Sequence, residues 1–179
     1  LVTYDENGGY PHPDHIRTHE LSVYAFEAAA DADRYPGLGA PWQISKVYYD
    51  RMFTPERFQS MYDELVSSDP ASPLIERLVE FRERFADRPA PAATTSVEVG
   101  EFFEHRDEAL RSHASQVPPD SAFFFWPNDL QRRAWPFESF QLARSLVESE
   151  LPESDLFAGI VDDQHQQPDQ LQQTGAQEA

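Results

Sequence analysis

The 179-residue sequence contains no cysteine. Disulfide bonds, thiolate zinc sites and a cysteine nucleophile are therefore excluded, and any metal ion has to be held by histidine and carboxylate side chains. No apolar run approaches the roughly 20 residues that a membrane-spanning helix requires. The first residues also lack the pattern of a secretory signal peptide, in which an apolar segment follows a positively charged one. We therefore expect a cytoplasmic protein without a membrane partner.

Basic residues are also scarce, because 14 Lys and Arg stand against 32 Asp and Glu and give a net charge of −18. A field of this sign repels phosphate backbones, which argues against nucleic acid as a partner. Lys46 is the single lysine, and the other basic residues are all Arg. We interpret this preference for Arg as a feature of the overall composition rather than as a functional site. Hydrophobic residues make up 40% of the chain, enough for one packed domain.

The order of residue types predicts an α/β fold. Residues 1–4 are apolar and β-branched and predict a buried strand, residues 5–9 form a polar glycine-rich loop, and residues 12–30 have a helical pattern. Strand, loop and helix in this order place functional sites at the carboxyl ends of strands. Because a buried strand begins at Leu1 itself, we expect the chain to start inside a domain.

The remaining elements follow from local signals. The pattern predicts strands at 45–52 and 96–99 and a helix over 100–116, whereas residues 140–146 fit either a helix or a strand. Thr54-Pro55 and Ser72-Pro73 each combine a capping residue with a proline and predict two further helix starts. Residues 161–179 are rich in Gln and Asp, and we expect a disordered tail after a domain at 1–160.

The chemistry is concentrated between Gly8 and His15. His12 and His15 are three residues apart where the loop meets the helix, so they share a helix face, and Asp14 lies between them. Imidazole nitrogens bind zinc, and a neighbouring carboxylate commonly fixes their tautomer. The glycines before Tyr10 would allow its ring to swing over a substrate. On spacing alone, such a histidine pair is more often two solvated side chains at a helix start than a metal site.

The thirteen residues from Thr3 to His15 (TYDENGGYPHPDH) resemble a segment of the LmbE-like and PIG-L-like zinc deacetylase superfamily. Within it the sequence is most similar to the amidase branch that acts on mycothiol S-conjugates, since the deacetylase branch usually has glycine where Pro11 stands. The resemblance continues through residues 110–116, 143–146 and 155–160. It implies a Rossmann-like LmbE/PIG-L fold, here without its N-terminal strands and helices.

The resemblance also implies a mechanism. In this family a zinc-bound water attacks the carbonyl carbon of an N-acyl glucosamine, and one Zn2+ is expected per complete chain. His15 matches the metal ligand, His12 the imidazole that stabilises the tetrahedral oxyanion, Asp14 the carboxylate that orients this imidazole, and Tyr10 the tyrosine that closes over the carbonyl. The expected substrate is a small-molecule mycothiol S-conjugate or a related glucosaminyl-inositol amide.

Two weaker candidates for substrate binding are His113 and Gln116, one turn apart at the end of the predicted helix over 100–116. A histidine on the apolar face of that helix is equally typical of a core position.

The His-Pro-Asp-Asp motif that supplies the family's other metal ligands and general base is absent from these residues, and we expect it upstream of Leu1. The chain as given is therefore expected to bind zinc weakly and to be inactive. Two alternatives stay open. One is an N-acetylglucosaminyl-inositol deacetylase of mycothiol biosynthesis, and the other is a truncated, non-catalytic binding module.

Overall fold

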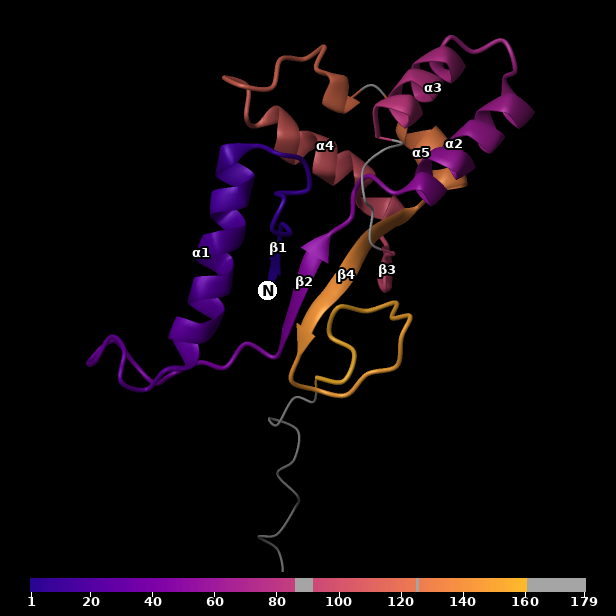
Figure 1. The fold of residues 1–179 in the computed structure, drawn as a ribbon. Coiled ribbons are helices and arrows are strands. Elements are labelled where there is room, and N and C mark those ends of the chain that lie inside the picture. Colours follow the sequence, from indigo (N-terminus) through magenta and orange to yellow (C-terminus); the bar gives the residue numbers. More distant parts are fainter. Residues whose placement is uncertain (86–91, 125, 161–179) are drawn as a thin grey trace, which may run out of the picture.

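The computed structural model describes residues 1–85, 92–124 and 126–160, and within them it contains one open four-stranded sheet and five α-helices (Figure 1). The strands are β1 (Val2–Thr3), β2 (Lys46–Asp50), β3 (Thr95–Glu98) and β4 (Phe137–Ser145), in the spatial order β1-β2-β4-β3. β1 runs parallel to β2, and β4 is antiparallel to both of its neighbours. The α/β class is thereby confirmed, with a mixed sheet. The expected tail at 161–179 lies outside the described residues.

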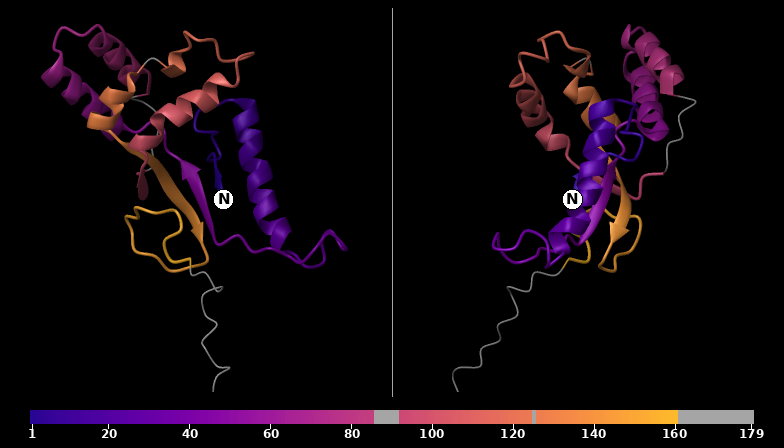
Figure 2. Two further views of the ribbon diagram at one scale, coloured as in Figure 1. Left: turned by 180° about the vertical axis from the view of Figure 1, so that it is seen from behind. Right: turned by 60° about the vertical axis from the view of Figure 1, so that its left-hand side comes forward.

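The helices form two groups. α1 (Pro13–Ala30) runs beside β1 and β2, whereas the other four gather beyond the end of the sheet where β2 finishes and β4 begins (Figures 1 and 2). These four are α2 (Pro55–Ser68), α3 (Leu74–Phe85), α4 (Phe103–Arg111) and α5 (Asn128–Ala134). Short 3-10 turns occupy Gly100–Phe102 and Ala122–Phe124. No helix among the described residues is both long enough and apolar enough to cross a membrane.

α1 begins where the sequence predicts. Pro13 occupies the first turn, and the N-cap residue His12 accepts a hydrogen bond from the backbone N–H of Asp14 at 3.2 Å. Phe26 is buried on this helix and packs with Ile44 and Val47 of the β2 segment. This contact seats α1 against the sheet and thereby fixes the direction of the histidine segment at its other end.

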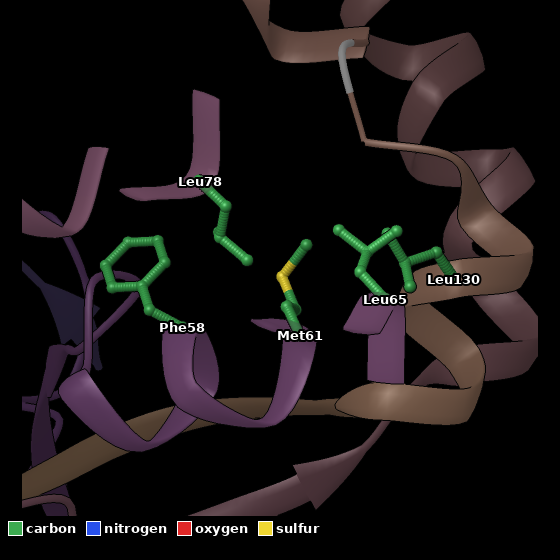
Figure 3. Packing of buried hydrophobic residues seen from close by; sticks show 5 residues of the cluster. All are labelled: Phe58, Met61, Leu65, Leu78 and Leu130. Atoms are coloured by element: carbon green, nitrogen blue, oxygen red, sulfur yellow. The ribbon is translucent and has the colours of Figure 1, made fainter. Parts of the chain in front are cut away.

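A second core lies among the helices beyond the sheet. Thr54 caps α2 by accepting from the Arg57 N–H at 3.2 Å, as its sequence signal predicts. Figure 3 shows the buried side chains of this core, to which α2, α3 and α5 all contribute. They are Phe58, Met61 and Leu65 from α2, Leu78 from α3 and Leu130 from α5. This core is separate from the one under α1.

The helix predicted over 100–116 ends early, and that prediction was wrong for its last turn. α4 stops at Arg111, and the hydroxyl of Ser112 bonds back to the Glu108 carbonyl at 3.1 Å. Such a local bond competes with continued helix. His113 and Gln116 are exposed, so packing against other elements does not stabilise a further helical turn. Residues 140–145 of the ambiguous segment 140–146 belong to strand β4.

The C-terminal described segment is fixed under the sheet by a buried ion pair. Lys46 donates to Glu153, and it also donates to the Ala158 carbonyl at 2.8 Å. Tyr48 and Thr95 donate to the same Glu153 carboxylate at 2.6 and 2.9 Å. The single lysine, to which sequence reasoning assigned no role, therefore holds a loop more than 100 residues away on the sheet.

Candidate functional site

The candidate site starts from the loop at the carboxyl end of β1. Asp5 is nearly buried, and one of its carboxylate oxygens accepts from the N–H groups of Asn7 and Gly9 at 2.9 and 3.0 Å. The loop turns through Gly8 and Gly9, at φ +74° and +70°. Glycine is required at position 8, because a Cβ there would lie 2.8 Å from the Cβ of His15. The loop is thus shaped around the first turn of α1.

His15 is held on three sides by this loop. Its Nδ1 lies 3.0 Å from the carbonyl oxygen of Gly8. Since a carbonyl can only accept, Nδ1 carries the proton, and in the neutral ring Nε2 presents a lone pair. The Tyr4 ring stacks on the imidazole at 4.1 Å, and the Tyr10 ring meets it edge-on at 4.5 Å. A fixed imidazole with a free Nε2 lone pair is the form that coordinates a metal ion.

His12 lies beside His15, with the ring centroids 5.4 Å apart. Its Nδ1 accepts from the N–H of Asp14, so the proton of the neutral ring is on Nε2. The Asp14 carboxylate is 4.0 Å from the same nitrogen, and its side chain is 90% exposed. The backbone N–H of Asp14 thus holds the His12 ring, and the orienting role of the carboxylate stays a prediction. The result is an N–H donor that is available to a ligand.

A cavity of about 1190 Å³ opens where β1 and β2 end, and it extends towards α2 and α3. Tyr10 and His15 line it, as do Asp5, Asp50 and Arg51, which sequence reasoning missed. The other predicted residues, His12 and Asp14 included, are not among its lining residues. α4 contributes Leu110 to the wall, but neither His113 nor Gln116 reaches it. Those two residues remain predictions without a contact to the site.

Arg51 and Asp5 connect the two strand ends at the cavity. Arg51 donates to Asp5 at 2.5 Å and also donates to the side-chain oxygen of Gln141. Burial raises the pKa of Asp5, but the hydrogen bonds from Gly9 and Arg51 outweigh it, so the pKa lies below its ordinary value. Asp5 stays ionised as the acceptor that shapes the loop. Its position directly after a predicted strand was the sequence signal that could have identified it.

Asp50, the last residue of β2, presents a carboxylate to the cavity. Among the described residues it forms no ion pair, although a hydrogen bond from the Arg51 backbone acts on it. Burial is the main reason that its pKa is raised, and the nearby charge of Glu138 adds to the shift, while Arg57 and Arg51 oppose it. A partly buried carboxylate with a raised pKa on a cavity wall is typical of a functional position.

The described residues do not complete a metal site. They contain no group of three or more His, Asp or Glu side chains that could hold a metal ion. His15 is suited by its tautomer to supply one ligand, whereas a catalytic zinc site commonly uses three protein ligands. Within ranges 1–85, 92–124 and 126–160, the chain therefore offers one side of such a site.

Comparison with known proteins supports the resemblance found in the sequence, although no protein-family model matches the chain. The chain is 45% identical over 164 residues to the mycothiol S-conjugate amidase of Streptomyces coelicolor, covering 90% of this chain and 55% of that protein. It is 37% identical over 164 residues to 1D-myo-inositol 2-acetamido-2-deoxy-alpha-D-glucopyranoside deacetylase 1 of Frankia alni, covering 90% of this chain and 56% of that protein. Deacetylase 2 of Frankia casuarinae is 38% identical over 170 residues, which cover 90% of this chain and 52% of that protein.

The chain thus spans about half the length of the curated relatives it matches. Over that half it is related to hydrolases named as amidases and deacetylases of mycothiol-pathway compounds, and the expected resemblance is confirmed.

Proposed function

We propose that the complete protein is an amidohydrolase that cleaves the amide between glucosamine and the acylated cysteine of mycothiol S-conjugates. The observation that carries this proposal is the meeting of Tyr10 and His15 on one cavity, in a chain 45% identical to a mycothiol S-conjugate amidase. In this proposal residues 1–160 are the later part of a single Rossmann-like domain of the LmbE/PIG-L type. The mixed sheet, with its site at the ends of two parallel strands, supports that assignment.

The residues present supply hydrogen-bond donors for the reacting carbonyl. His12 holds a proton on Nε2 and is 48% exposed, so it can donate to the oxygen that becomes negative when the amide is attacked. Tyr10 is 40% exposed and sits edge-on to His15, where its hydroxyl can close over the same group. One such donor is worth about 100- to 1000-fold in kcat. Asp14 contributes by fixing the His12 ring through its backbone N–H.

We propose Zn2+ as the metal of the complete protein, with His15 as one ligand. The lone pair on Nε2 supports this role, and the hydrogen bond from Nδ1 to Gly8 fixes the ring in the required orientation. The remaining ligands are proposed to lie outside the residues described, since these hold no complete group. When bound, zinc supplies hydroxide at neutral pH.

The second candidate is hydrolysis of the acetyl group of N-acetylglucosaminyl-inositol. The 36–38% identity to several deacetylases favours it, whereas the 45% identity to the amidase and the proline at position 11 favour the first reaction. A non-catalytic binding module is the third candidate, and the incomplete ligand set of the described residues is the observation in its favour.

The test uses the complete protein as purified, assayed on a mycothiol S-conjugate and on N-acetylglucosaminyl-inositol, with metal content measured in parallel. We expect faster turnover of the conjugate, one zinc per chain, and loss of activity with a strong chelator. His15→Ala should lose both metal and activity, and His12→Ala should lose activity but keep the metal. His105→Ala, on the exposed part of α4, is the matched control.

Each other result selects another candidate. Preference for the acetylated sugar would make the protein a deacetylase. Absence of turnover on both substrates by metal-loaded protein would leave the binding module. Full activity of His15→Ala would contradict the assignment of this residue as a ligand.

A further inference from the structure

Several apolar side chains that line the cavity away from His15 are exposed. Met52, Val79 and Phe123 are 49%, 37% and 62% exposed, and all three line it. Together with Phe53 and Leu110, which also line the cavity, they form a surface that we call the apolar wall. Its members come from the connection between β2 and α2, from α3, and from α4 and the 3-10 turn after it. Exposed apolar surface gathered in one concave place marks a binding site for an apolar group.

The apolar wall adjoins the polar end of the cavity. Asp50 and Arg51 belong to the polar end with His15, and Met52 follows them directly in the chain. Consecutive Cα atoms are 3.8 Å apart, so Asp50 and Phe53 are separated by at most about 11 Å. The polar end and the apolar wall are therefore neighbouring parts of one cavity.

The charges around the wall restrict what can bind there. Glu56 and Glu83 line the same cavity, and the chain as a whole carries a net charge of −18. Arg82 also lines it, but its guanidinium lies over the ring of Tyr62, 5.4 Å from the ring centre. A negatively charged ligand group would be repelled by these two carboxylates, so an uncharged apolar group suits this surface.

We propose that the apolar wall is the subsite for the substituent on sulfur in a mycothiol S-conjugate, and that it selects uncharged alkyl or aromatic groups. This inference rests on the proposed amidase function. With the scissile carbonyl at Tyr10 and His15, the cysteine sulfur is three covalent bonds of about 1.5–1.8 Å from the carbonyl carbon. Its substituent therefore extends from the polar end of the cavity into the neighbouring wall.

The test compares S-methyl, S-butyl, S-benzyl and S-carboxymethyl conjugates as substrates of the complete protein. Each methylene group that is buried should improve kcat/KM about fourfold. We expect S-benzyl to be preferred over S-methyl by at least tenfold and S-carboxymethyl to be the poorest substrate. Phe123→Ala and Val79→Asp should reduce the ratio of S-benzyl to S-methyl about tenfold.

Two further variants keep the test decisive. Val79→Thr keeps the shape of the side chain and should lower the ratio in the same direction even if Val79→Asp fails to fold. Val66→Asp is the matched control, because Val66 is 42% exposed on α2 but does not line the cavity, so its ratio should equal that of the wild type.

The outcomes separate the two proposals. If all conjugates are turned over and the ratio of S-benzyl to S-methyl is unchanged in every wall variant, the subsite is wrong and the amidase function stands. A structure of the complete protein in which other residues cover the apolar wall would have the same meaning. If the metal-loaded wild type hydrolyses no S-conjugate, the amidase function is wrong and the subsite is wrong with it.

Discussion

Arg51 donates a hydrogen bond to the carboxylate of Asp5 at 2.5 Å, and both side chains are about nine-tenths buried. The pair connects the end of β2 to the loop that follows β1. From Asp5 the connection continues through the N–H of Gly9 into the glycine turn, and the Gly8 carbonyl then accepts from His15. The position of the candidate metal ligand thus depends on an ion pair that does not touch it.

Replacing Asp5 with Asn should therefore destabilise the protein. The substitution leaves the Arg51 guanidinium buried without its counter-ion, which costs about 3–5 kcal/mol in the free energy of unfolding. Urea unfolding at neutral pH measures this loss. Glu20→Gln is the control, since it breaks the exposed Arg17–Glu20 pair and should cost less than about 1 kcal/mol. Equal losses in the two variants would show that the Arg51 pair is no stronger than a surface pair.

The two glycines of the loop should differ in their response to alanine. Gly8 and Gly9 both have positive φ, so alanine costs about 1–2 kcal/mol of backbone strain at either position. Only at Gly8 does the new methyl group overlap its neighbours, at 2.8 Å from the Cβ of His15, whereas at Gly9 the nearest atom is an ordinary 3.5 Å away in Tyr4. Gly8→Ala should therefore be the less stable variant and should shift the NMR signals of the His15 imidazole. A larger effect of Gly9→Ala would contradict this account of the turn.

Much of the fold could be predicted from local signals. The Thr54 cap, the prolines at 13 and 55 and the glycine loop act within a few residues, and each marks a boundary that the structure confirms. The end of α4 could not be predicted in this way. His113 lies one turn after Leu110 and so continues the face of the predicted helix past Arg111. Whether distant elements cover residues 113–116 cannot be seen from this spacing, and these residues are exposed.

The same distinction applies to the candidate site, where residues of one segment could be predicted and residues brought together by strand pairing could not. His12, Asp14 and His15 belong to one short segment, where residue types and spacing made them candidates and the family resemblance suggested their roles. Of the three, His15 lines the cavity. Asp50 and Arg51 reach the same cavity only because β2 pairs in parallel with β1, and no spacing in the sequence shows that register. The role of Lys46 was missed for the same reason, since its partner is 107 residues away.

Glu153→Gln should remove stability in a pH-dependent way. Burial raises the pKa of the Glu153 carboxyl, but hydrogen bonds from Lys46 and neighbouring groups outweigh this and lower the pKa from 4.5 to about 2. The folded state thus favours the ionised form, so its contribution is complete above pH 4.5 and is lost as the pH falls towards 2. At pH 7 the variant should be about 3–5 kcal/mol less stable than the wild type.

Urea unfolding between pH 3 and 7 checks this dependence. The difference between wild type and Glu153→Gln should narrow below pH 4.5, and the exposed Glu150→Gln should show no such trend. A difference that stays constant over this range would mean that packing, rather than the ion pair with Lys46, holds the C-terminal segment on the sheet.

Asp50→Asn should stabilise the protein at neutral pH. The pKa of Asp50 is raised above 3.8, chiefly by burial, so the folded state binds its proton more tightly than the unfolded chain does. Its favourable contribution is present below pH 3.8 and is lost as the pH rises through the folded pKa. Asparagine removes the cost of ionisation, so the variant should gain about 0.5–2 kcal/mol at pH 7. No gain is expected below pH 3.8.

The same variant should lower kcat/KM of the complete protein if the Asp50 carboxylate, which lines the cavity, accepts a hydrogen bond from the substrate. Asp33→Asn, in an exposed loop, is the control for both measurements and should change neither. A gain in stability with unchanged kcat/KM would remove Asp50 from the site, and a loss of stability at pH 7 would show that its carboxylate is held by the nearby arginines. The combination of greater stability and lower activity is the result that assigns Asp50 to substrate binding.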